Sequence, residues 1–226
     1  MAQRAVEPIH LRPAAELAER VLLPGDPHRA LAVAQALLEE PLMFNHARGL
    51  WGYTGRAPDG EALSVQSTGM GGPSAAIVVE ELIALGARRL VRIGTCGALR
   101  AGLALGTLVA AREVLPDDGA SAALGANGRL VPDPALTDAL VAAGAMPARV
   151  VSTDLFYDAR EAGWEADVVE MEAAALLRVA SLRGAAAACL LAVTDVPEDG
   201  GMLRIDPEGL ESAGLALGRT GLAAFG

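Results

Sequence analysis

The chain contains no lysine, and all 18 of its basic residues are arginine. Without lysine there can be no Schiff base with a carbonyl substrate, no attachment of pyridoxal phosphate and no Walker-type phosphate loop. Any cation that meets a ligand must be a guanidinium, whose planar fork binds carboxylates and phosphates through paired hydrogen bonds.

Cysteine, histidine and aromatic residues are also scarce. The two cysteines, Cys96 and Cys189, lie in apolar runs without metal-binding spacing, so we expect buried free thiols. The three histidines (His10, His28 and His46) are scattered along the chain. These residues predict no metal centre.

Long apolar runs and an excess of positive charge are missing as well. The longest apolar run, residues 185–193, has the length of a strand and is far shorter than the roughly 18 residues of a membrane span. Residues 1–4 do not resemble a signal peptide, so we interpret the protein as cytoplasmic. The net charge of −10 argues against nucleic-acid binding, which needs a basic surface.

Strand-like and helix-like segments alternate through all 226 residues, of which 52% are hydrophobic. Strands are expected at 21–23, 90–93, 107–114, 148–152 and 185–193, and helices at 26–39, 75–85, 134–143, 173–182 and 207–222. Residues 50–69 are typical of a hairpin, 116–130 of a surface loop and Gly200-Gly201 of a mobile loop. The pattern predicts a single α/β domain over residues 1–226, with a central mixed sheet flanked by helices.

Two of the predicted strands end in a glycine turn beside an arginine. Gly25 and Arg29 follow the first, while Arg92 and Thr95 lie at the end of the second. Ligands of α/β folds bind at the carboxyl ends of strands, and a buried guanidinium is costly unless an anion meets it. We therefore expect a phosphate site here. The alternatives are a surface ion pair for Arg29 and an internal ion pair for Arg92.

Five segments, in the same order, resemble segments of the hexameric purine nucleoside phosphorylases of the nucleoside phosphorylase and uridine phosphorylase family. They are residues 21–30, 48–55, 68–74 (with 80–82 following), 92–98 and 169–174. One such segment would be a weak signal, but five in register are a strong one. The resemblance implies the nucleoside phosphorylase fold, phosphorolysis of purine nucleosides, inorganic phosphate as a substrate, and no metal or organic cofactor.

The resemblance also implies residue roles. The phosphate-binding residues would be Gly25, Arg29, Arg48, Arg92 and Thr95. The nucleoside-binding residues would be His10, Met70, Phe156, Glu170, Met171, Glu172, Thr194 and Asp195. Among these, Glu172 would accept hydrogen bonds from the ribose 2′- and 3′-hydroxyls. His10 would contact the 5′-hydroxyl and Arg48 the phosphate in a neighbouring subunit, which implies a homohexamer built as a trimer of dimers.

The chemistry of these roles follows from the residue types. Cleavage of an N-glycosidic bond places positive charge on the sugar, which a phosphate held by Arg92 stabilises and attacks. Alternation along the chain puts Glu170 and Glu172 on one side and Met171 on the other, unless this run is only the acidic start of a helix.

Asp195 ends an apolar strand, so desolvation should raise its pKa. A protonated Asp195 would donate to purine N7 as the base leaves, which is general acid catalysis. The alternative is a helix cap or turn before Pro197. By resemblance, Arg204 would swing toward the aspartate and assist it.

The choice of base and nucleophile follows from two further features. Residues 154–160 lack the glutamine with which uridine phosphorylases read uracil, and Thr194-Asp195 matches the purine-type acid position, so we favour purine. The three arginines Arg29, Arg48 and Arg92 favour phosphate over water. Uridine phosphorylase, a 5′-methylthioadenosine phosphorylase or nucleosidase, and a non-catalytic phosphate-binding module remain alternatives, although the glycine pattern of a dinucleotide fold is absent. Residues 116–130 and 158–167 look shortened.

Overall fold

The computed structural model describes residues 6–158, 163–198 and 201–226. Within these residues ten strands form one sheet in the order β10-β9-β6-β7-β8-β5-β1-β4-β3-β2. Their bounds are β1 (Arg20–Leu23), β2 (Glu39–Asn45), β3 (Gly52–Arg56), β4 (Ala62–Gln66), β5 (Arg89–Ala98), β6 (Leu108–Asp117), β7 (Met146–Thr153), β8 (Val168–Glu170), β9 (Ala186–Glu198) and β10 (Gly201–Arg204). The sheet is mixed, as the sequence predicts.

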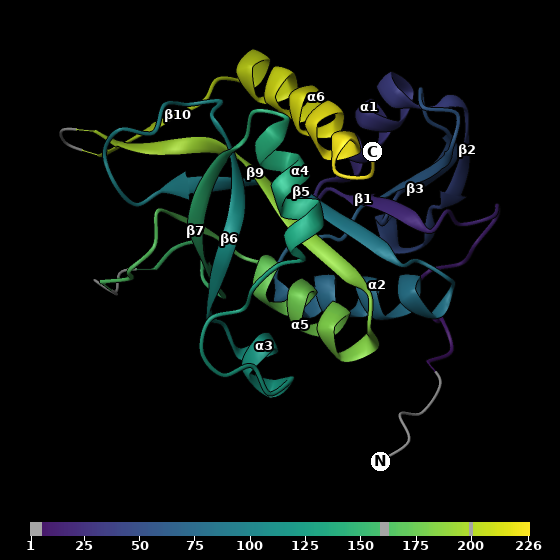
Figure 1. Cartoon of the computed structure of the whole chain (residues 1–226), viewed down its shortest axis with the longest axis horizontal. Helices are drawn as coiled ribbons and strands as arrows, with labels where there is room; N and C mark the ends of the chain where they lie inside the picture. Colours follow the sequence, from purple (N-terminus) through teal and green to yellow (C-terminus); the bar gives the residue numbers. More distant parts are fainter. Residues whose placement is uncertain (1–5, 159–162, 199–200) are drawn as a thin grey trace.

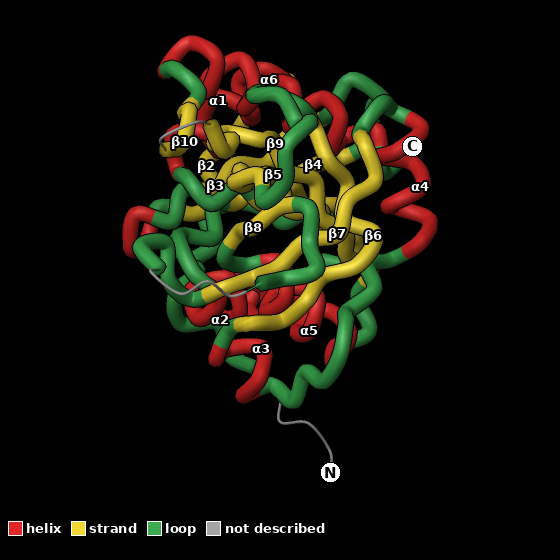
Figure 2. The backbone as a smooth tube through the Cα atoms, turned by 90° about the vertical axis from the view of Figure 1, so that its left-hand side faces the viewer, coloured by secondary structure: helices red, strands yellow, loops and turns green. Residues whose placement is uncertain are grey.

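Helices cover both faces of the sheet (Figure 1). They are α1 (Pro27–Leu37), α2 (Gly72–Ala84), α3 (Gly119–Ala123), α4 (Pro134–Ala142), α5 (Ala173–Arg183) and α6 (Pro207–Ala223). Helices α1, α4 and α6 pack on one face, while α2, α3 and α5 pack on the other, an arrangement that the turned view in Figure 2 also shows. None of the helices in the described part of the chain is long and apolar enough to cross a membrane.

Local sequence signals account for the ends of several helices. Asp26 accepts a hydrogen bond from the backbone N–H of Arg29, and Pro27 occupies the first turn of α1. Asp133 and Asp206 cap α4 and α6 in the same way, each directly before a proline. These caps satisfy N–H groups that a helix cannot pair internally.

The register of the central strands brings distant residues together. Strand β1 is parallel to β5, with Leu23 opposite Arg92, and β5 is parallel to β9, with Gly97 opposite Asp195. Strand β8 runs antiparallel to the end of β5, with Val169 also opposite Gly97. The ends of β1, β5, β8 and β9 therefore meet at one place in the sheet.

The structure differs from the sequence analysis in three segments. Residues 39–45 form the edge strand β2, which the sequence analysis left unassigned. The predicted surface loop 116–130 contains the end of β6 and the short helix α3, because Asp118 caps the backbone N–H of Ser121. Gly201 starts strand β10, so it is wrong to place it in a mobile loop; Gly200, like residues 159–162 of the shortened segment, lies outside the described residues.

Candidate active site

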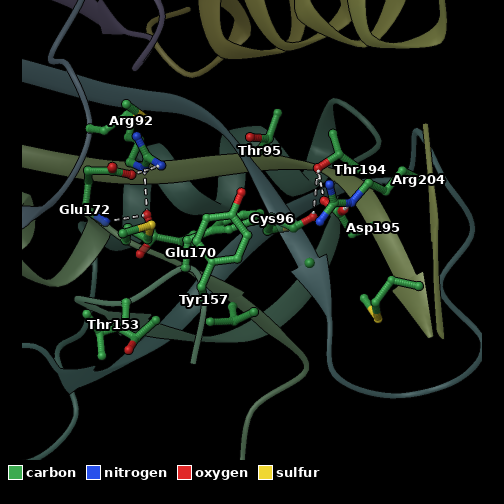
Figure 3. A pocket seen from close by; sticks show the side chains of 17 residues that line it. Arg92, Thr95, Cys96, Thr153, Tyr157, Glu170, Glu172, Thr194, Asp195 and Arg204 are labelled. Atoms are coloured by element: carbon green, nitrogen blue, oxygen red, sulfur yellow. Dashed lines mark hydrogen bonds and ion pairs between the residues drawn. The ribbon is translucent and has the colours of Figure 1, made fainter. Parts of the chain in front are cut away.

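A cavity of about 390 Å³ opens where the central strands end. It is lined by Met70, Arg92, Thr95, Cys96, Gly97, Thr153, Leu155, Phe156, Tyr157, Val169, Glu170, Met171, Glu172, Thr194, Asp195, Met202 and Arg204. Figure 3 shows Arg92 and Glu172 at one end and Asp195 with Arg204 at the other. The structure thus gathers most of the predicted nucleoside-binding residues around one space.

Arg92 is buried between two carboxylates at the first end of this cavity. Its Nε donates to Glu170 Oε2 at 2.8 Å and its Nη2 to Glu172 Oε2 at 2.5 Å. Both bonds make the internal ion pair that the sequence analysis weighed as an alternative. The third nitrogen, Nη1, is buried without a hydrogen-bond partner in the described part of the chain. Because a buried unpaired donor is costly, Nη1 is suited to bind an anion.

The position two residues after Arg92, Gly94, has no room for a side chain. A Cβ at Gly94 would lie 2.6 Å from Arg92 Nη2, a distance at which the guanidinium would have to move. Strand β5 continues to Ala98, so the glycine turn predicted directly after residue 93 is wrong. Gly94 lies within the strand and makes room for the guanidinium of Arg92.

Glu170 is buried, and its carboxylate accepts hydrogen bonds from groups of the protein itself. Its carboxylate accepts hydrogen bonds from Arg92, from the hydroxyl of Ser152 and from the backbone N–H groups of Glu172 and Ala173. Burial raises the pKa of Glu170, and the charge of Arg92 opposes that shift. The structure therefore places Glu170 as a support for Arg92 and for the first turn of α5, whereas the sequence analysis placed it against the nucleoside.

Glu172 reaches Arg92 from the same side as Glu170, as predicted, but Met171 also lines the cavity rather than facing away from it. Its Oε1 accepts the backbone N–H of Gly71 at 2.5 Å, and its Oε2 accepts Arg92. Gly71 precedes α2 and has a φ of 85°, in the region that favours glycine. The glycine loop after β4 thus holds the carboxylate beside the cavity.

Arg29 lies close to Arg92 but not on the cavity wall. Its side chain runs along α6, where a Cβ at Gly214 would lie 3.5 Å from Arg29 Nε. Burial lowers the pKa of Arg29; Asp26 opposes this shift and the charge of Arg92 adds to it. Two guanidinium groups in electrostatic contact favour an anion between them.

The opposite end of the cavity is half exposed. Asp195 Oδ1 lies 2.9 Å from Arg204 Nε, and Asp195 Oδ2 accepts the hydroxyl of Thr194 at 2.9 Å. The guanidinium of Arg204 also lies over the ring of Phe156, 5.7 Å from its centroid, and Tyr157 packs edge-on against that ring. Asp195 is part of β9, so the cap or turn interpretation of this residue is wrong.

Arg204 meets Asp195 through strand pairing. Strand β10 is antiparallel to β9, with Arg204 directly opposite Asp195. The two residues are therefore associated, as predicted, and Arg204 does not need to swing to reach the aspartate. Cross-strand neighbours have Cβ atoms about 5 Å apart, which allows the two side chains to pair.

Besides Arg29, three predicted site residues lie away from this cavity. Arg48 is exposed in the turn Ala47–Gly49 with a φ of 58°, and His10 is bonded to Glu81 of α2. Gly25 also lies outside the wall, with its carbonyl bonded to the N–H of Gly69. Arg48 and His10 can therefore serve a site only if that site belongs to another copy of the chain.

The sequence analysis missed several cavity residues. Cys96, Thr153, Leu155, Tyr157 and Met202 line the space without having been singled out as site residues. Of these, only Tyr157 carried a signal, because it adjoins Phe156 in a chain with 3% aromatic residues. Both cysteines are buried and free, as predicted, and burial raises the pKa of the Cys96 thiol well above its usual range.

A cavity at the ends of sheet strands, with a buried arginine at one end and an acid at the other, is a typical small-ligand site of α/β proteins. The chain belongs to the Phosphorylase superfamily, which matches residues 19–210. Its sheet and helices accordingly form the nucleoside phosphorylase fold.

Individual proteins that are similar to this chain carry names from the same family. A DeoD-type purine nucleoside phosphorylase of Caldanaerobacter subterraneus subsp. tengcongensis is 37% identical over 197 residues, 80% of this chain and 84% of that protein. The DeoD-type protein of Clostridium beijerinckii is 35% identical over 203 residues, 83% and 85% of the two chains. A crystal structure of uridine phosphorylase from Vibrio fischeri ES114 covers 92% of both chains with a TM-score of 0.82 and 23% identity, which shows the shared fold.

Proposed function

We propose that the protein is a phosphate-dependent purine nucleoside phosphorylase. It converts a purine ribonucleoside or deoxyribonucleoside and inorganic phosphate into the free base and the (deoxy)ribose 1-phosphate. The observation that carries this proposal is one cavity with the unpaired Nη1 of Arg92 at one end and Asp195 at the other. The relatives named purine nucleoside phosphorylase support purine over pyrimidine.

The anion end supplies the nucleophile and the grip on the sugar. Phosphate would bind to Nη1 of Arg92 with Arg29 behind it, and Thr95 and the Gly25 turn would contribute further donors. Glu172, held by Gly71 and Arg92, would accept the ribose hydroxyls on its remaining lone pairs. A phosphate fixed beneath the sugar stabilises the positive charge that grows there as the glycosidic bond breaks.

The base end supplies the proton. Asp195 would donate to purine N7 as negative charge moves onto the base, while Arg204 and Thr194 orient its carboxyl group. Phe156 and Met171 would pack on the base and sugar, with Met70 at the mouth. The reaction requires no metal or organic cofactor, because phosphate itself is the attacking group.

The proposed working unit is an oligomer, by resemblance a hexamer. The positive charges of Arg92 and Arg29 are offset by the carboxylates of Glu170 and Glu172, so this chain alone offers a dianionic phosphate little net attraction. Arg48 from a neighbouring copy would supply the missing charge. A fully active monomer, seen by light scattering at assay concentration, would contradict this part of the proposal.

The test is chromatography of adenosine, inosine, guanosine and uridine after incubation with the enzyme, with and without phosphate. We expect base release from purine nucleosides only, and only with phosphate. Release without phosphate would assign the protein to the nucleosidases, and release of uracil would assign it to the uridine phosphorylases. No release from any nucleoside would refute the proposal.

A further inference from the structure

Glu81 is a buried acid that the proposed mechanism does not use. It lies on α2 with 3% of its surface exposed and does not line the cavity. All of the donors described for its carboxylate come from a segment about 70 residues earlier in the chain. Leu11 N–H donates at 2.7 Å, His10 N–H at 3.0 Å and His10 Nδ1 at 2.6 Å.

These hydrogen bonds keep Glu81 ionised. Burial alone would raise its pKa, but the donors from Leu11 and His10 outweigh burial and lower the pKa of Glu81 from its usual value. A charged carboxylate can only accept, so Nδ1 of His10 must carry a proton. The pair has the form in which a carboxylate fixes the tautomer and the ring orientation of a histidine.

The ring therefore presents its other nitrogen, Nε2, away from Glu81. The side chain of His10 is 32% exposed, and in the described part of the chain Nε2 has no hydrogen-bond partner. In the neutral ring Nε2 can only accept, and in the charged ring it can only donate. A hydroxyl group pairs with Nε2 in both states, whereas a methyl group leaves it unpaired.

His10 lies outside the cavity of its own chain, as the site requires if it serves a neighbouring copy. Its sequence neighbour Ile9 is a large apolar side chain that is 69% exposed. Glu81, by contrast, is buried on α2. It can transmit a fixed position from α2 to the ring.

We infer that Glu81 is a positioning residue that gives the enzyme its selectivity for nucleosides with a free 5′-hydroxyl group, by holding His10 with Nε2 toward that group. The inference rests on the proposed function and adds a substrate class to it. Nucleosides with a 5′-hydroxyl are substrates of choice, and 5′-deoxy and 5′-methylthio nucleosides are poor ones. The specificity thus depends on a residue that never touches the substrate.

The experiment compares kcat/KM for inosine and 5′-deoxyinosine at saturating phosphate. The wild-type enzyme should prefer inosine about tenfold, the size of one hydrogen bond to an uncharged group. Glu81→Gln should reduce this preference to about twofold or less while leaving kcat/KM for 5′-deoxyinosine unchanged. His10→Asn should also lose the preference for inosine, because the asparagine amide replaces Nδ1 as the donor to Glu81 but offers nothing in place of Nε2.

Glu80→Gln is the matched control. Glu80 precedes Glu81 on α2 and pairs with Arg183, at 2.6 Å, rather than with His10. The Glu80→Gln enzyme should keep the full tenfold preference for inosine over 5′-deoxyinosine. A Glu81→Gln enzyme that keeps the wild-type preference, or that loses activity equally on both substrates, would show that Glu81 is only structural.

Two further outcomes separate this inference from the proposed function. A wild-type enzyme that phosphorolyses both nucleosides equally well refutes the inference and leaves the proposed function standing. An enzyme that cleaves neither inosine nor 5′-deoxyinosine is compared instead on adenosine and 5′-deoxyadenosine, and one that cleaves no purine nucleoside refutes both. Ring ¹⁵N NMR of the unaltered chain, which has three histidines, gives a readout that does not depend on any variant folding: a neutral His10 with its proton on Nε2 overturns the inference.

Discussion

The two ends of the cavity differ in how their charges are held. At the anion end, the side chains of Arg92, Glu170 and Glu172 are 4%, 1% and 8% exposed, and two short ion pairs join them. At the base end, the side chains of Asp195 and Arg204 are 21% and 62% exposed, and one ion pair joins them. The first end is part of the core, and the second lies at an edge strand.

This difference matches the chemistry that the proposed reaction needs at each end. Every substrate of such an enzyme brings the same phosphate and nearly the same sugar, so the groups that bind them can be rigid and preorganised. Bases vary, and a half-exposed acid can adapt to them and exchange protons with solvent. Changes at the anion end should therefore affect stability and all substrates, and changes at the base end should affect some substrates only.

The largest effect is expected for Arg92→Ala. The variant leaves two buried carboxylates without their cation, which should cost about 3–5 kcal/mol of unfolding free energy. Phosphorolysis should fall about 10³-fold for every nucleoside, because the phosphate loses its fixed donor. Urea denaturation and kcat/KM for phosphate measure the two losses.

Arg112→Ala is the control for Arg92, since it removes an exposed arginine paired with Asp138. Its unfolding free energy should change by less than about 1 kcal/mol, with activity unchanged. If Arg92→Ala retained phosphorolysis close to the wild-type rate, the anion end would have been assigned to the wrong residues.

An intermediate and selective effect is expected for Asp195→Asn. Activity on adenosine should fall about 10²- to 10⁴-fold, the usual contribution of a general acid. Activity on 7-methylinosine should change only a few-fold, because its base leaves without needing a proton on N7. Steady-state kinetics on the two nucleosides measure the ratio.

Glu198→Gln, at the exposed end of the same strand, should leave both activities of the Asp195 comparison unchanged. An equal loss on both substrates in Asp195→Asn would mean that the aspartate has a structural role. The contrast between the two ends of the cavity would then disappear.

The smallest effect is expected for Asp59→Asn, at an ion pair remote from the cavity. The hydrogen bond from Arg20 is the main cause that lowers the pKa of Asp59 to about 2, and the Asp59 side chain is 38% exposed. Because the folded-state pKa is depressed, the pair stabilises the fold above about pH 4 and ceases to do so as the pH falls toward 2. The variant should cost about 1 kcal/mol at pH 7, after solvent screening, and almost nothing near pH 2.

Denaturation of wild type and Asp59→Asn at pH 7, 4 and 2.5 measures this dependence. A difference in unfolding free energy that stayed constant over this range would contradict it. Together with Arg92→Ala, the variant shows how much burial changes the effect of an arginine–carboxylate pair.

Much of the fold could be predicted from the sequence because the signals are local. Asp26 and Pro27 mark the start of α1 through the cap and the ring geometry of these two residues alone. The alternation of residues 170–172 predicted that Glu170 and Glu172 share a side, and both bind Arg92. It placed Met171 on the other side, but β8 ends at Glu170 and Met171 lines the same cavity. Strand β2 was missed because its exposed Leu42 and Met43 give it no alternating pattern.

The candidate site was predictable only as a set of residue types at the ends of strands. Local patterns in the sequence indicate that any cation meeting a ligand is a guanidinium, that a glycine turn follows β1, and that an acid follows the apolar run of β9. The folded chain adds three contacts that no local pattern indicates: Arg92 donates through two nitrogens to carboxylates about 80 residues away, Arg204 pairs with Asp195 across β10 and β9, and Glu81 binds His10. The reason is physical: caps, turns and periodicity depend on neighbours in the chain, whereas the partner of a buried charge is selected by which distant groups the closed sheet brings within hydrogen-bond distance.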